Sequence, residues 1–284
     1  MNRLLLCADG SAYSEVCARY AAWYARRTGC AIEAVYVSDV WKYETSFLSD
    51  LSGSLGIQPY QDMMDTMQSL EQQKSELIEA ALRAMLEREG LGGRLSFHHR
   101  TGGVVDQLES FEKGADPVSL VLLGQRGENA NSSTGHLGST MERVVRASTK
   151  PCLVTTRQFT PVTKLLLAYD GSPSATKALH WLVQAKEFKD LSLDLVTVAA
   201  ASGDDAAATR LQESESVLRA GGWKPTCQLL TGEPGDAIAE YVSQQRIDLL
   251  VTGAYGHSAI RHLLIGSTTT ELVRRCQVPV FLFR

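Results

Sequence analysis

The 284-residue chain carries one motif twice, as Leu4-Leu5-Leu6-Cys7-Ala8-Asp9-Gly10-Ser11 and again as Leu165-Leu166-Leu167-Ala168-Tyr169-Asp170-Gly171-Ser172. In each copy an apolar run of strand length ends in Asp-Gly-Ser, which favours a turn. Later motifs return in the same order, because Gly138-Ser139-Thr140 matches Gly266-Ser267-Thr268. We infer two homologous domains in tandem, each of ordinary domain size.

The composition is that of an ordinary globular protein. The chain is 44% hydrophobic and 21% charged, with a formal net charge of −4 and no basic run, which argues against a nucleic-acid or anionic-membrane partner. No window approaches the ~20 apolar residues of a membrane span, and Leu4–Cys7 is too short for a secretory signal. The cysteines show neither CxxC spacing nor a shared pairing pattern, so we expect reduced thiols and a cytoplasmic protein.

Short apolar runs alternate with longer segments of helical period, which is typical of βαβ units and a parallel sheet. In the first half we predict strands at Arg3–Ala8, Ile32–Val37, Leu95–Arg100, Leu120–Leu123 and Cys152–Thr155. In the second half we predict strands at Lys164–Ala168, Leu193–Val198, Thr226–Leu230, Ile247–Thr252 and Pro279–Phe283. The helices of that half are predicted at Ser174–Phe188, Asp205–Ala220, Gly235–Gln245 and Ser267–Cys276. The predicted class is therefore α/β, with two doubly wound domains at residues 1–157 and 163–284.

The two halves differ most after the second strand. The first half carries an additional segment, Ser38–Pro59, with aromatic residues among polar and glycine positions, and a long helix is predicted to follow over Tyr60–Glu89. We interpret the segment as a flap that packs against the other domain, because exposed aromatic side chains are costly unless they are covered. A lid over a site is the alternative. The linker Arg157–Thr163 is short, so we expect the domains to pack together.

Glycines after the fourth strand of the second half predict a phosphate site. Gly253-x-x-Gly256 is followed, after nine further residues, by Gly266-Ser267. In a doubly wound sheet ligands bind outside the carboxyl ends of the strands, and glycine lets backbone amides approach a phosphate closely. Ser267 and Thr268 stand where a helix is predicted to begin, so its unpaired N–H groups and positive dipole end would face the anion.

Two further residues would complete such a site. Asp170 follows the first strand of the second half and can accept a hydrogen bond from a ribose hydroxyl or a base amine. The main chain at Val198 can contact the edge of the base. Both belong to strand ends on the same rim of the sheet.

The chain resembles a tandem member of the universal stress protein family. The ATP-binding subgroup carries Gly-x-x-Gly, nine residues and Gly-Ser/Thr, which Gly253 to Ser267 match. Thr231-Gly232-x-x-x-Asp236 and the closing Val278-Pro279-Val280 match as well, so the resemblance spans the chain. It implies Rossmann-like, adenine nucleotide alpha hydrolase-like domains, each with a five-stranded parallel sheet of order 3-2-1-4-5. It also implies nucleotide binding and pairing of the domains through their last strands, here Cys152–Thr155 and Val280–Phe283.

The resemblance implies a nucleotide site in each domain. In domain 2 it is formed by Ala168, Tyr169, Asp170, Val198, Gly253, Tyr255, Gly256, His257, Arg261, Gly266, Ser267 and Thr268. The matching positions in domain 1 are Ala8, Asp9, Val37, Gly124, Arg126, Gly127, Gly138, Ser139 and Thr140. Domain 1 departs from the pattern, because Glu128–Leu137 is longer than its counterpart and polar where domain 2 has Leu263-Leu264-Ile265. Its motif is degenerate, although Arg126 could reach a phosphate.

Other interpretations of the same residues stay open. Asp9 and Asp170 could cap the helices that follow them, and Gly253 could serve only a tight turn. His257 and His262 do not predict a metal site, because their spacing in a loop without a cysteine or carboxylate cluster fixes no ligand geometry.

No P-loop, nucleophile elbow or general base is evident in the sequence. We therefore expect ATP, AMP or ADP to be bound rather than rapidly turned over. Mg²⁺ is a possible companion of the nucleotide, and no dedicated protein site for it is evident in the sequence. The expected protein is a stress-response regulator with an unidentified protein partner, an intramolecular pseudo-dimer able to form a homodimer. Two rival functions are a slow ATPase or adenylate-transferring enzyme, and a scaffold for protein interactions that does not depend on nucleotide.

Overall fold

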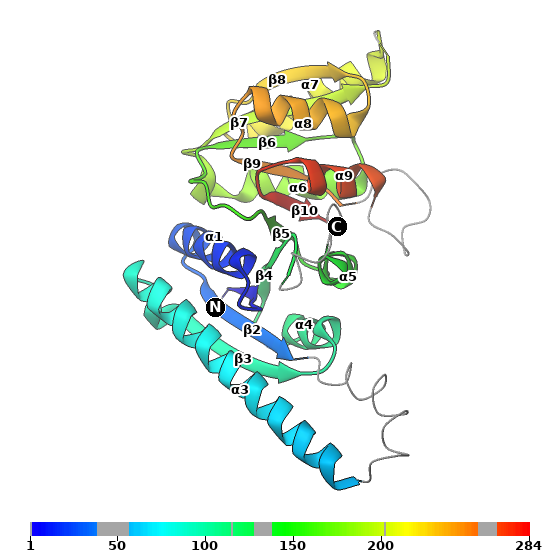
Figure 1. The fold of residues 1–284 in the computed structure, drawn as a ribbon. Coiled ribbons are helices and arrows are strands. Elements are labelled where there is room, and N and C mark those ends of the chain that lie inside the picture. Colours follow the sequence, from blue (N-terminus) through cyan, green and yellow to red (C-terminus); the bar gives the residue numbers. More distant parts are fainter. Residues whose placement is uncertain (1, 39–56, 115, 128–137, 202, 255–265) are drawn as a thin grey trace.

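The computed structural model describes residues 2–38, 57–114, 116–127, 138–201, 203–254 and 266–284 (Figure 1). The elements of the first half are β1 Arg3–Cys7, α1 Ala12–Thr28, β2 Ala31–Ser38, α3 Ile57–Arg88, η1 Gly92–Arg94, β3 Leu95–Thr101, α4 Val104–Glu112, β4 Val118–Gly124, α5 Ser139–Ala147 and β5 Cys152–Thr155. Those of the second half are β6 Lys164–Ala168, α6 Pro173–Gln184, η3 Lys186–Phe188, β7 Ser192–Ala199, α7 Asp205–Ala220, β8 Thr226–Thr231, α8 Pro234–Gln244, β9 Leu249–Gly253, α9 Ser267–Arg275 and β10 Val280–Phe283.

All these strands form one ten-stranded sheet of order β3-β2-β1-β4-β5-β10-β9-β6-β7-β8. Strands are parallel within each half, whereas β5 and β10 pair in antiparallel fashion, with Phe281 opposite Leu153. The α/β class with two tandem domains is confirmed. The two five-stranded sheets are joined into one continuous sheet instead of being separate. The physical reason is that all residues of β5 and β10, the strands that meet, are buried. Each would leave unpaired backbone groups at an apolar edge if the halves stood apart.

The repeated Asp-Gly-Ser motif starts a helix in both halves. Gly10 and Gly171 have φ of +78° and +79°, a backbone conformation that glycine adopts without steric cost. The side chains of Ser11 and Ser172 accept hydrogen bonds from the third backbone N–H beyond them and so cap α1 and α6. The helix caps are thus the serines and not the aspartates, which corrects the capping interpretation of the aspartates.

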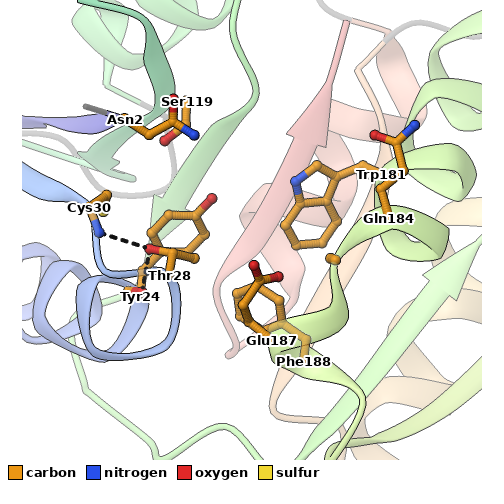
Figure 2. A pocket seen from close by; sticks show the side chains of 10 residues that line it. Asn2, Tyr24, Thr28, Cys30, Ser119, Trp181, Gln184, Glu187 and Phe188 are labelled. Atoms are coloured by element: carbon orange, nitrogen blue, oxygen red, sulfur yellow. Dashed lines mark hydrogen bonds between the residues drawn. The ribbon is translucent and has the colours of Figure 1, made fainter.

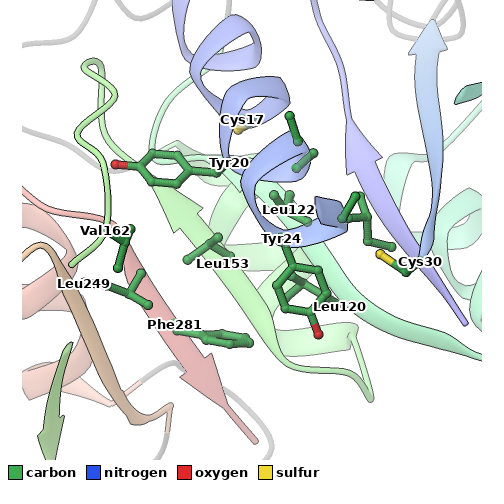
Figure 3. Close-up of a cluster of buried hydrophobic side chains, with 14 of the residues drawn as sticks. Cys17, Tyr20, Tyr24, Cys30, Leu120, Leu122, Leu153, Val162, Leu249 and Phe281 are labelled. Atoms are coloured by element: carbon green, nitrogen blue, oxygen red, sulfur yellow. The ribbon is translucent and has the colours of Figure 1, made fainter. Parts of the chain in front are cut away.

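The core has two layers, one on each face of the sheet. On one face α1, α3, α6 and α7 cover a cluster that includes Leu4 of the first half and Phe281 of the second. On the other face α4, α5, α8 and α9 cover a cluster that runs from Leu5 to Leu272. Figure 3 shows the first cluster where it crosses the pairing of β5 with β10, with Leu153 beside Phe281. Both layers are therefore continuous between the domains.

Helix α6 ends earlier than the predicted Ser174–Phe188. It stops at Gln184 and is followed by the 3₁₀ turn η3. The reason is tertiary, because the Leu182 carbonyl accepts a hydrogen bond of 2.8 Å from the indole Nε1 of Trp223. In a continued helix that carbonyl would accept from the main chain four residues later. The Ser38–Pro59 segment falls mostly outside the described residues.

The linker and a cavity lie on the interface between the domains. Tyr20 on α1 packs against Phe159 of the linker with the two rings tilted and their centroids 4.7 Å apart. The Tyr20 hydroxyl donates to the Thr160 carbonyl at 3.2 Å. Elsewhere along this interface is a cavity of about 280 Å³. Figure 2 shows Tyr24 and Trp181 on opposite sides of it. Among the described helices, none is both long and apolar enough to cross a membrane.

Candidate functional site

Among the predicted residues of domain 2, those that the structure describes lie at the carboxyl ends of β9, β6 and β7 and at the start of α9. Ala168 at the end of β6 is in register with Thr252 of β9 on one side and Val196 of β7 on the other. Asp170 comes two residues after that register position and is exposed. The edge is held in place by the main chain, since the Tyr169 N–H donates to the Val196 carbonyl at 2.9 Å.

The start of helix α9 faces this edge. The Gly266 N–H donates to the Ala254 carbonyl at 3.2 Å, and the Thr269 hydroxyl donates to the Gly253 carbonyl at 3.1 Å. These two bonds tie the first turn of α9 to the end of β9. The cap residue Gly266 has no side chain to accept from that turn, so the amides of Ser267 and Thr268 are well placed to meet an anion.

Gly253 also has a structural role. A Cβ at this position would collide with the Ser174 hydroxyl and lie 2.8 Å from the Ala175 amide nitrogen. The absence of a side chain therefore lets the start of α6 approach β9 closely. This glycine is required by packing whether or not a ligand binds, so substituting it would not test binding alone.

Domain 1 brings the end of β1, the turn after β4 and the start of α5 together. A Cβ on Gly127 would lie 2.8 Å from the Asp9 carboxylate, so the turn after β4 touches the end of β1. The Gly138 N–H donates to the Gln125 carbonyl at 3.1 Å, and α5 begins at Ser139 with no side-chain cap. The glycine turns and the helix start therefore adjoin in domain 1, on both sides of the stretch 128–137 that lies outside the described residues.

The other predicted residues divide into two groups. Ala8 directly follows β1 and Ala168 ends β6, and both are buried. Val37 and Val198 are half-buried on the second strand of each half, and Thr140 is exposed in the first turn of α5. Tyr255, Gly256, His257 and Arg261 lie outside the described residues. Within the described part of the chain no group of three His, Cys, Asp or Glu side chains is arranged to hold a metal ion.

A cysteine adjoins the domain 1 edge. Cys7 ends β1, directly before Ala8 and Asp9. Burial raises the pKa of the Cys7 thiol well above its ordinary value, and neighbouring thiols and carboxylates raise it further. The thiol is therefore protonated at neutral pH and is a poor nucleophile.

Two contacts of these edges were not anticipated from the sequence. Gln125, between the glycines of domain 1, donates from Nε2 to the Val273 carbonyl of α9 at 2.5 Å, which links the two candidate sites. Arg210 of α7 lies against Gly171, with Cδ 2.9 Å from the position of a Cβ on that glycine. Aligning α3 with α7 as part of the repeat would have placed Arg210 opposite Ile78. No local sequence motif marks either residue, so the sequence alone did not single them out.

The fold and its strand-end turns define a tandem doubly wound α/β protein with a glycine-capped helix at each candidate site. The universal stress protein family model matches residues 1–156 and again 161–284. The chain therefore belongs to the universal stress protein family.

Two curated relatives agree with this assignment, and one solved structure has the same fold. Universal stress protein Slr1230 of a Synechocystis strain is 39% identical over 291 residues, with full coverage of both chains. A Thermus aquaticus universal stress protein, named for its position in the QAH/OAS sulfhydrylase 3′ region, is 30% identical over 42% of this chain and 97% of its own length. The crystal structure of an Archaeoglobus fulgidus universal stress protein superposes with a TM-score of 0.74 at 22% identity, covering 99% of this chain and 98% of that one.

Proposed function

We propose that this chain is a nucleotide-dependent stress-response regulator that binds ATP or a related adenine nucleotide in domain 2. The observation that carries the proposal is the start of α9, where a glycine cap leaves first-turn amides available beside Gly253, at the sheet edge where the exposed Asp170 follows β6. The phosphates would accept hydrogen bonds from the amides of Ser267 and Thr268, and the helix dipole would favour their charge. Asp170 would accept from a ribose hydroxyl or the base amine.

The proposal includes the domain bounds 1–157 and 163–284. It also includes nucleotide contacts at Tyr255, Gly256, His257 and Arg261, and a protein partner that distinguishes the nucleotide-bound chain from the free chain. Mg²⁺ would arrive with the nucleotide. Domain 1 would bind more weakly, because the stretch between its glycines is longer and polar.

One backbone amide can be removed without altering the helix. Ser267 is the first helical residue of α9, where proline is favoured because its missing N–H has no intrahelical partner. The preceding Gly266 has φ −53° and ψ 141°, the extended conformation that a residue before proline adopts. Ser267→Pro therefore deletes one donor of the proposed cradle, whereas Ser267→Ala keeps the amide and removes only the hydroxyl.

We expect isothermal titration of the full chain with ATP to show binding that Ser267→Pro weakens about ten- to hundredfold, the value of one charge-assisted hydrogen bond. Ser267→Ala should bind close to the unmodified chain. Ser139→Pro is the matched control, because Gly138 has φ −66° and ψ 126°, and it should leave the domain 2 affinity unchanged. Absence of ATP binding, or equal affinities for the Pro and Ala variants at 267, would contradict the proposal. Rapid phosphate release would favour the enzyme rival.

A further inference from the structure

Arg210 and Ile78 occupy equivalent places in the two domains. Leu91 closes α3 by donating to the Leu86 carbonyl at 2.7 Å, and Trp223 closes α7 by donating to the Leu218 carbonyl at 3.0 Å. Counting back the same distance from Leu86 and Leu218 gives Ile78 and Arg210. The two helices can therefore be aligned residue by residue.

Both side chains rest on the glycine that follows the site aspartate. The Cγ1 of Ile78 lies 3.2 Å from the position of a Cβ on Gly10, and the Cδ of Arg210 lies 2.9 Å from that of Gly171. Each glycine is held at positive φ. The residue that covers this turn is thus apolar in domain 1 and cationic in domain 2.

The environment of Arg210 is unusual for a guanidinium. Its Nε is buried and has no hydrogen-bond acceptor among the residues that the structure describes. A buried donor without a partner is unfavourable and calls for an explanation. The nearby Asp204 carboxylate caps α7 by accepting from the Ala207 N–H at 3.0 Å. Its charge also interacts with that of Arg210, but it accepts no hydrogen bond from the buried Nε. Ile78, in contrast, is 6% exposed and packs in the core.

The position of Arg210 indicates which part of a ligand it would meet. In the sheet order β6 lies between β9 and β7. The amides of α9 belong to the β9 side, whereas α7 follows β7 and packs on it. Arg210 therefore reaches the turn after β6 from the side away from the proposed phosphate cradle, which is the end left for the base and ribose.

We propose that Arg210 contacts the base of the nucleotide bound in domain 2 and makes this domain the preferred nucleotide site. This inference rests on the proposed function. The planar guanidinium stacks on an aromatic base and donates to its ring acceptors. Ile78 offers only an apolar surface at the corresponding place in domain 1, so the two domains differ in what they recognise.

The test measures binding of two probes to the full chain, in competition with a fluorescent ATP analogue. Arg210→Ile, which installs the domain 1 residue, should weaken ATP binding at least about tenfold and leave binding of inorganic tripolyphosphate unchanged. Arg210→Lys keeps the charge but loses the planar group. On a logarithmic scale, it should restore less than half of the ATP affinity that Arg210→Ile loses. Arg219→Ile is the matched control, because Arg219 lies on the same helix in an exposed ion pair with Glu215, and it should bind both probes normally.

Three results would overturn the inference. Arg210→Ile could bind ATP as tightly as the unmodified chain, or it could lose tripolyphosphate by the same factor as ATP, which would show a general charge effect. In either case the unmodified chain would still bind ATP, so the proposed function would stand. Absence of ATP binding to the unmodified chain would instead overturn both. Circular dichroism and the thermal midpoint of each variant separate these outcomes from misfolding.

Discussion

At the residue scale, burial keeps the cysteine thiols protonated. All six cysteines are free, and Cys17, Cys152 and Cys276 are buried. Burial is the main cause that raises the pKa of each of these three thiols from 9.0 to about 12. The folded chain therefore holds these protons more tightly than the unfolded chain does. Their contribution to stability is complete below about pH 9 and is lost as the pH rises toward about 12.

This linkage predicts that the protein is less stable in alkali. Between about pH 8 and pH 10 the free energy of unfolding should fall by about 1 kcal/mol for each of the three thiols, because the unfolded thiols ionise and the folded ones do not. Urea unfolding at the two pH values measures the difference. A Cys152→Ala variant removes one titrating group and should show a smaller fall. An equal fall in the variant would contradict the assignment.

Single residues also show what local sequence can and cannot reveal. The repeat located Asp9 and Asp170 at strand ends, because Asp-Gly-Ser after an apolar run is a local signal. Helix capping by these aspartates was an alternative interpretation, and the structure excludes it because the serine two residues later accepts from the helix instead. Arg210 was missed because its contact with Gly171 joins α7 to the turn after β6, and no short-range pattern encodes such a contact.

At the element scale, one buried carboxylate joins β6, β7 and α8. Asp194 of β7 is 2% exposed. It pairs with the Lys164 ammonium at 2.7 Å and accepts a hydrogen bond of 3.0 Å from the Tyr241 hydroxyl. Burial raises the pKa of Tyr241 well above its ordinary value, and the bond to Asp194 raises it further. The Asp194 carboxylate thus holds the side chains of Lys164 and Tyr241 in place.

Removing this carboxylate should be costly. We expect Asp194→Ala to lower the free energy of unfolding by about 3 kcal/mol, because it leaves a buried hydroxyl and a cation without their shared acceptor. Urea denaturation gives the value. Glu215→Ala breaks the more exposed pair with Arg219 and should change stability by about 0.5 kcal/mol or less. Similar losses for the two variants would show that Asp194 is not a structural junction.

The same scale explains which elements were predictable. Strands such as β6 and β5 have the predicted bounds, because an apolar run between turn residues specifies them locally. The end of α6 was predicted four residues too far along the chain, at Phe188 rather than Gln184. Its limit depends on Trp223, which follows in the chain only after β7 and α7.

At the scale of the whole molecule, the two domains share one sheet and both core layers. The cluster on each face contains residues of both halves, and the Arg284 side chain donates to the Arg146 carbonyl at the end of α5 at 2.5 Å. The repeat predicts two domains, but their union through β5 and β10 was an implication of the family resemblance. Nothing in the residues of an edge strand specifies which other strand will pair with it.

A shared core predicts that the domains unfold together. We expect differential scanning calorimetry to give one transition with a calorimetric enthalpy equal to the van't Hoff enthalpy. Because β5 meets β10 within one chain, the midpoint should not change when the protein concentration is varied about a hundredfold. Two resolved transitions, or a midpoint that rises with concentration, would contradict this picture.

The bond from Gln125 to the Val273 carbonyl has a mechanical consequence. It anchors the turn between Gly124 and Gly127 to the very helix whose first residues form the proposed cradle of domain 2. Any displacement of that turn must either move α9 with it or break the hydrogen bond to Val273. If both candidate sites bind a ligand, this bond would give them a direct mechanical connection between the domains.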